Sequence, residues 1–262
     1  MPSPVAPEAS HTILWAYQGK GSARACLNIT GSKQVLAAGT IGQIRQISVT
    51  CCVDMRLLWQ EVTLSEGIQN WLQSSELINA FVGDLFRSDN WHFTRDASGG
   101  GTFVDIGTHV MDLMLWLAGS SPPTQVVAFN QPLSDGLVSV VNTQAKLANG
   151  ATLSLTFNDG VSGGDFDFSG HGRLSVYGDR GLLTTDWTGF MVTEGKEIWV
   201  EHDGIREQVE PESETITPTA AFVATILDDV PNIAPALEAA QVVALTEATY
   251  RSIEAGNIIK IS

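Results

Sequence analysis

The chain has 262 residues, of which 44% are hydrophobic, and 14 basic against 29 acidic residues give it a formal net charge of −15. The apolar fraction suffices for a packed core and excludes wholesale disorder, while the acidic excess argues against a nucleic-acid or anionic-membrane partner. Three cysteines, Cys26, Cys51 and Cys52, are too few for a disulfide scaffold and contain no CxxC pair for zinc. With no long apolar stretch and no signal-peptide pattern, we expect a cytoplasmic protein without a membrane span.

The first half of the chain is predicted to contain helices joined by long connections. Residues 1–30 form an N-terminal segment to which we assign no structure. A short helix over residues 32–38 ends at Gly39, and a strand follows from Gly42. An amphipathic helix is predicted over residues 67–82. After a loop, a glycine-rich turn leads directly into a helix over residues 102–117.

The second half is predicted to be rich in strands, because runs of Val, Thr, Leu and Phe alternate with turn signals. The dipeptide Asn149-Gly150 between two such runs is typical of a β-hairpin. The predicted strands cover residues 125–129, 137–146, 151–158, 172–177, 182–185, 189–193 and 197–200. Helices over residues 219–228 and 235–254 and a strand over 258–261 close the chain. This order indicates an α+β fold, an open, predominantly antiparallel sheet with helices packed on one face.

The helix predicted over residues 102–117 carries the candidate chemistry. Asp105, His109 and Asp112 are spaced i, i+4 and i+7, so they share one face of an otherwise apolar helix. In one interpretation the histidine is a general acid/base and the aspartate orients it or holds a substrate hydroxyl. In a second, the three side chains bind a metal ion. In a third, His109 is a core histidine and Asp105 a residue near the helix start. Spacing alone leaves all three open.

The segment GGGTFVDIGTHVMDLMLWLAG, residues 99–119, resembles a signature of the Gfo/Idh/MocA oxidoreductases. Their pattern is GGG, a short gap, Asp-x-Gly-x-His-x-x-Asp and then Trp-Leu-x-Gly. The stretches KQVLAAGTIGQI at 33–44 and VYGDRGLL at 176–183 are also similar to family patterns. The resemblance covers roughly residues 30 to 262. It identifies residues 31–262 as resembling the family's C-terminal domain, which binds substrate and forms oligomers.

The resemblance implies an NAD(P)-dependent oxidoreductase acting on a sugar, a polyol or a related hydroxyl compound. The catalytic residues that it implies are Asp105 and His109. The substrate-binding residues that it implies are Trp91, His92, Gly100, Gly101 and Asp112. In the family the outer sheet face packs against another subunit, so a homo-oligomer through that face is implied as well.

The family's cofactor-binding pattern is not found in these 262 residues. A Rossmann domain would show a strand, GxGxxG and a helix, whereas Gly19-Lys20-Gly21 lacks the third glycine and that context. The family's catalytic Glu-Lys-Pro motif is absent too. We therefore expect no cofactor-binding or metal-binding residues and an isolated chain that is inactive, although the resemblance implies NAD or NADP for the family. The alternatives are a non-catalytic binding or oligomerisation module, and a subunit that borrows a Rossmann domain from a partner.

Overall fold

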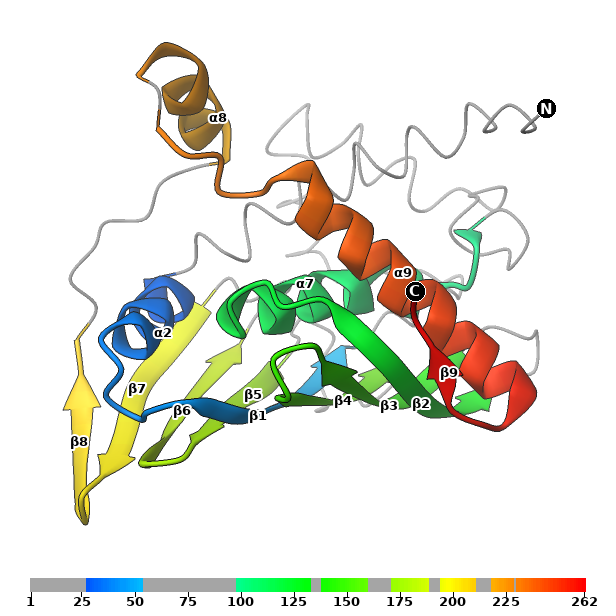
Figure 1. Cartoon of the computed structure of the whole chain (residues 1–262), viewed down its shortest axis with the longest axis horizontal. Helices are drawn as coiled ribbons and strands as arrows, with labels where there is room; N and C mark the ends of the chain where they lie inside the picture. Colours follow the sequence, from blue (N-terminus) through cyan, green and yellow to red (C-terminus); the bar gives the residue numbers. More distant parts are fainter. Residues whose placement is uncertain are drawn as a thin grey trace, which may run out of the picture.

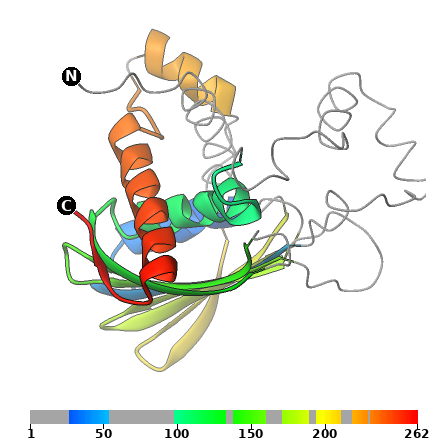
Figure 2. The ribbon, with the colours of Figure 1, turned by 90° about the vertical axis from the view of Figure 1, so that its right-hand side faces the viewer.

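A computed structural model of the chain describes residues 27–53, 98–132, 138–159, 171–188, 194–210, 218–228 and 230–262. These residues form a curved, nine-stranded sheet with helices on one face (Figures 1 and 2). The strands are β1 (Ile44–Val53), β2 (Pro123–Pro132), β3 (Val138–Leu147), β4 (Thr152–Asp159), β5 (His171–Gly178), β6 (Gly181–Thr188), β7 (Glu194–His202), β8 (Ile205–Val209) and β9 (Ile259–Lys260). The helices are α2 (Leu27–Ala37), the π-helix η2 (Phe103–Gly107), α7 (Thr108–Leu117), α8 (Pro218–Leu227) and α9 (Ala236–Ala255).

The sheet has the order β8-β7-β6-β5-β1-β4-β3-β2-β9, and of its neighbouring pairs only β1 and β4 run parallel. The prediction of an α+β fold with a predominantly antiparallel sheet is therefore confirmed. One strand was missed: β8 is almost wholly exposed and lacks the alternation that predicts a strand. The helix predicted over 67–82 and the strand predicted over 189–193 lie outside the described residues.

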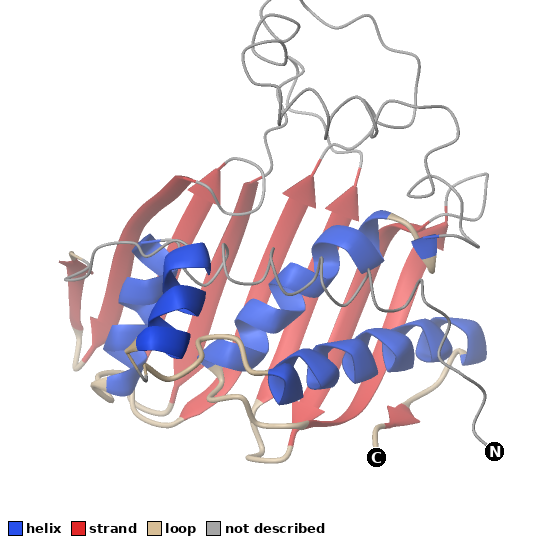
Figure 3. Ribbon diagram, turned by 90° about the horizontal axis from the view of Figure 1, so that it is seen from above, coloured by secondary structure: helices blue, strands red, loops and turns tan. Residues whose placement is uncertain are grey.

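The core lies between the sheet and the helices that cross it (Figure 3). The predicted helix over 102–117 is present as η2 followed by α7, and α7 is buried on most of its circumference. The helix ends where predicted, because Gly119 has a φ of +81° and reverses the chain. Lys33 of α2 holds this end in place. Its Nζ donates a hydrogen bond of 2.5 Å to the carbonyl of Trp116 and lies 5.1 Å from the centre of that indole ring.

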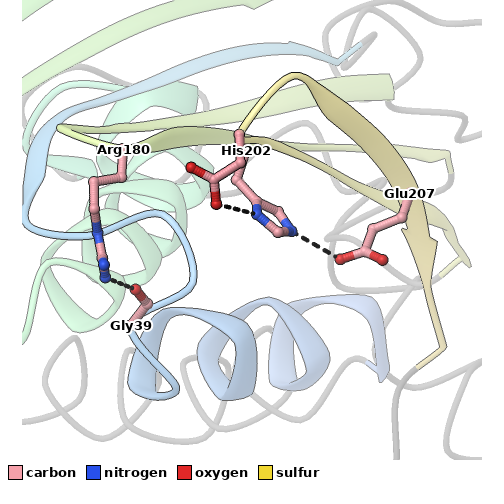
Figure 4. A network of polar contacts seen from close by, with 5 residues as sticks. Gly39, Arg180, His202 and Glu207 are labelled. Atoms are coloured by element: carbon pink, nitrogen blue, oxygen red, sulfur yellow. Dashed lines mark hydrogen bonds and ion pairs between the residues drawn. The ribbon is translucent and has the colours of Figure 1, made fainter.

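Two of the segments that resemble family patterns contact each other beside the sheet (Figure 4). The guanidinium of Arg180 donates a hydrogen bond of 2.6 Å to the carbonyl of Gly39, and a carboxylate oxygen of Asp179 accepts one of 2.9 Å from the backbone of Gln43. A Cβ on Gly42 would lie 2.0 Å from that same oxygen, so a side chain there would clash. These contacts therefore attach the residues that precede β1 to the turn between β5 and β6, and they stabilise the fold.

The same view shows His202 at the end of β7 (Figure 4). Its Nε2 lies 3.0 Å from a carboxylate oxygen of Glu207, and its Nδ1 lies 3.2 Å from one of Asp203. The hydrogen bonds to Glu207 and then to Asp203 raise the pKa of His202 above its ordinary 6.5. Protonated His202 therefore stabilises the β7–β8 hairpin at the edge of the sheet through these two carboxylates.

The sheet face away from the helices carries small hydroxyl side chains near its centre. Ser48 of β1 stands in register with Ser154 of β4 on one side and with Ser175 of β5 on the other. The described helices all lie on the opposite face (Figure 2). Small hydroxyl side chains in register leave a surface on which a second layer can lie closely.

Candidate active site

The glycine-rich turn before η2 folds back on itself. Gly99, Gly100 and Gly101 all have positive φ, between +74° and +148°. The hydroxyl oxygen of Ser98 accepts hydrogen bonds from the N–H groups of Gly100 and Gly101, at 3.3 and 2.8 Å. The carbonyl of Gly101 in turn accepts a bond of 3.2 Å from the backbone N–H of Asp105. The turn thus sets where the helix that carries the candidate residues begins.

The helix opens with a π-helical turn, a conformation that is rare and frequently occurs at functional sites. The first and last residues of this π-helical turn lie in close contact, because a Cβ on Gly107 would lie 2.5 Å from the ring of Phe103. The hydroxyl of Thr108 donates to the carbonyls of Val104 and Asp105, at 2.8 and 3.1 Å. The glycine of the Asp-x-Gly motif is therefore needed for this close approach, and Asp105 lies in the middle of the π-helical turn.

The three predicted residues on this helix differ in burial. Asp105 is half-buried, as are its neighbours Val104 and Thr108. His109 is 6% exposed and Asp112 only 1% exposed. Burial raises the pKa of Asp105 from 3.8 to about 6. A carboxyl group with such a pKa exchanges its proton close to neutral pH, as general acid/base catalysis requires.

The structure brings together five of the seven predicted site residues. Gly100 and Gly101 lie in the turn, and Asp105, His109 and Asp112 follow on the same helix. Trp91 and His92 lie outside the described residues. Across the part of the chain that the structure describes, no group of three or more His, Cys, Asp or Glu side chains could hold a metal ion. The metal-binding interpretation of the Asp105, His109 and Asp112 spacing therefore has no support.

Two anchors of this site were missed by the sequence analysis. The hydroxyl of Thr102 donates a hydrogen bond of 2.8 Å to a carboxylate oxygen of Asp159, and both residues are buried. The hydroxyl of Tyr250 on α9 donates a bond of 3.0 Å to the carbonyl of Gly100. The partners are 57 and 150 residues apart in sequence, so no local pattern predicts either contact.

The backbone N–H groups of Gly100 and Gly101 have a partner within the glycine-rich turn. Phosphate-binding turns present free backbone N–H groups at the start of a helix. Here the N–H groups of Gly100 and Gly101 are already bound by the side chain of Ser98. These two N–H groups are therefore not available to a phosphate group in this turn.

Comparison with known families and structures identifies the fold. The model of the GFO/IDH/MocA C-terminal domain matches residues 30–184. The chain belongs to this oxidoreductase family. The match includes the glycine-rich turn, the Asp105–His109 helix and the sheet from β1 to β5. No curated protein sequence matches the chain.

Solved structures with the same fold include several GFO/IDH/MocA-like oxidoreductases. Aldose-aldose oxidoreductase from Caulobacter crescentus, complexed with glycerol, is 18% identical with a TM-score of 0.65, and the match covers 91% of this chain and 62% of that one. GenD2 from gentamicin A biosynthesis, in complex with NAD, is 20% identical with a TM-score of 0.62, covering 92% and 62%. Levoglucosan dehydrogenase, in complex with NADH and L-sorbose, is 16% identical with a TM-score of 0.64, covering 95% and 65%.

The chain thus spans 62–65% of the length of these three proteins. At such identities the likeness shows a shared fold, and the family assignment rests on the match to the domain model. No described helix is both long enough and apolar enough to cross a membrane.

Proposed function

We propose that this chain is the substrate-binding half of a GFO/IDH/MocA-type oxidoreductase and that it binds a sugar, a polyol or a related hydroxyl compound beside Asp105 and His109. The observation that carries the proposal is the half-buried Asp105 in a π-helical turn, one helical turn before the buried His109. Glycerol and L-sorbose in the two related complexes support a polyhydroxylated ligand.

In this proposal His109 takes or gives the proton of the substrate hydroxyl, and Asp105 supports it or contacts the substrate. The pKa of Asp105, raised to about 6 by burial, keeps that carboxyl able to change charge near neutral pH. Proton transfer of this kind contributes about 10²–10⁴-fold to a reaction rate. NAD(P) would accept or supply the hydride in a complete enzyme, as the related complexes with NAD and NADH suggest.

We expect the 262-residue chain by itself to have no NAD(P)-dependent dehydrogenase activity. Hydride transfer needs a cofactor fixed against the substrate carbon, and these residues contain neither the GxGxxG pattern nor the Glu-Lys-Pro lysine. The test follows the absorbance of reduced nicotinamide with a panel of sugars and inositols, with His109→Ala as the control. Turnover by the wild-type chain that disappears in His109→Ala would contradict this expectation.

We also propose that the chain forms a homo-oligomer through the outer face of its sheet, around Ser48, Ser154 and Ser175. These three small hydroxyl side chains stand in register and carry no charge, so two copies of an acidic chain can approach there. A further uncovered surface is α8, on which Ile226 is 63% and Leu227 74% exposed. Exposed apolar surfaces of this kind mark interfaces. Light scattering that finds a monomer at micromolar concentration would contradict the proposal.

A further inference from the structure

The middle glycine of the GGG motif, Gly100, lies in close contact with a tyrosine on another helix. Gly100 has a φ of +148°, and a Cβ there would lie 2.3 Å from the hydroxyl oxygen of Tyr250. By contrast, a Cβ on Gly99 would have no atom within 4 Å. The turn at Gly100 is therefore shaped by close contact with Tyr250 of α9.

Tyr250 fixes this turn through two kinds of contact. Its hydroxyl donates a hydrogen bond of 3.0 Å to the carbonyl of Gly100. Its ring packs edge-on against Phe103, with ring centres 5.8 Å apart, and Phe103 packs in the same way on Phe157 of β4 at 5.5 Å. The ring of Phe103 also presses against Gly107. These contacts connect the segment that contains Asp105 to helix α9 and to the sheet.

The hydroxyl of Tyr250 is linked to Asp105 through the backbone of the glycine turn. The carbonyl of Gly100, which Tyr250 holds, belongs to the residue before Gly101, whose carbonyl accepts the backbone N–H of Asp105. A shift of the turn therefore moves the start of the π-helix and changes how far the Asp105 carboxyl is shielded from water. Burial raises the pKa of this carboxyl above that of an ordinary aspartate.

We propose that Tyr250 is a positioning residue of the candidate site, whose hydroxyl holds the glycine turn so that the Asp105 carboxyl stays shielded. The proposal rests on the proposed function in that Asp105 is the group to be positioned for substrate. The packing of the Tyr250 ring is a structural role, whereas the hydrogen bond of its hydroxyl serves the site.

The substitution Tyr250→Phe separates these two roles, because it removes the hydroxyl and keeps the ring. The titration of Asp105 is followed by ¹³C NMR of its carboxyl carbon in the full chain, with Asp105→Asn assigning the signal. We expect the pKa of Asp105 to fall in Tyr250→Phe from about 6 toward 3.8. Where a sugar binds, its dissociation constant should rise about two- to tenfold, the range that one net hydrogen bond covers.

The matched control is Ser252→Ala on the same helix. The hydroxyl of Ser252 accepts a hydrogen bond of 2.9 Å from the backbone N–H of Ala128 and donates one of 2.6 Å to the carbonyl of Asn257, away from the glycine turn. This variant should lose stability and leave the Asp105 titration unchanged. An unchanged Asp105 pKa in Tyr250→Phe, or an equal change in Ser252→Ala, would overturn the proposal. Because the titration needs no ligand, a failure to bind any sugar would count against the proposed function and leave this inference standing.

Discussion

Asp105→Asn should stabilise the protein at neutral pH, and the gain should depend on pH. The folded-state pKa of Asp105, about 6, lies above its ordinary value of 3.8. Between these values the folded state binds more protons than the unfolded chain, so the stability of the wild type falls as the pH rises from about 4 to about 6. The difference of the two pKa values corresponds to about 3 kcal/mol at 1.36 kcal/mol per pKa unit. Asn stays neutral and avoids this penalty.

The assay is urea denaturation of wild type and Asp105→Asn at a series of pH values from about 4 to about 8. The variant should gain little at the acid end and at most about 3 kcal/mol above pH 6. The exposed Asp228→Asn serves as the control for removing one negative charge from a strongly acidic chain. A gain that does not change with pH, or a wild type that becomes relatively more stable as the pH rises, would refute the reasoning. Either outcome would mean that the folded protein does not disfavour the Asp105 carboxylate.

Three further predictions concern other parts of the structure. Thr102→Val leaves the buried carboxylate of Asp159 without one of its donors and should lower the free energy of unfolding, measured with urea, by about 1–3 kcal/mol. Ser154→Arg places a charge on the outer sheet face and should convert an oligomer to a monomer in light scattering, whereas Ala255→Arg at the exposed end of α9 should not. His202 should titrate above pH 6.5 by NMR, because its pKa is raised in the folded state. The stability that protonated His202 adds should be present below pH 6.5 and lost as the pH rises through the folded-state pKa. The variant His202→Gln should abolish this pH dependence of stability.

The sequence predicted those elements whose signals are local. Gly119 and Gly256 end α7 and α9 with positive φ, and Asn149-Gly150 forms the β3–β4 hairpin. The periodicity of an apolar helix likewise predicted the burial of α7. Such features depend on residues that are close together in the chain, so one sequence suffices to predict them.

Features that depend on distant residues were not predicted. The parallel pairing of β1 with β4 joins residues that are 106 positions apart in the sequence, such as Gln46 and Thr152. The π-helical turn depends on Phe103 packing against Phe157 as well as on Gly107. The role of Gly100 follows from Tyr250, a residue on another helix. The candidate residues Asp105 and His109 were thus identified from a motif, whereas the contacts that hold them in place required the fold.

The central claim, that a hydroxyl compound binds beside Asp105 and His109, is tested most directly by NMR. The ring signals of His109 in the labelled chain are followed during titration with L-sorbose, glycerol and inositols, in wild type and in Asp105→Asn. We expect a saturable shift of the His109 signals with at least one of these compounds, and a weaker or absent response in Asp105→Asn. Binding that leaves His109 unaffected, or that is equally strong in Asp105→Asn, would contradict it.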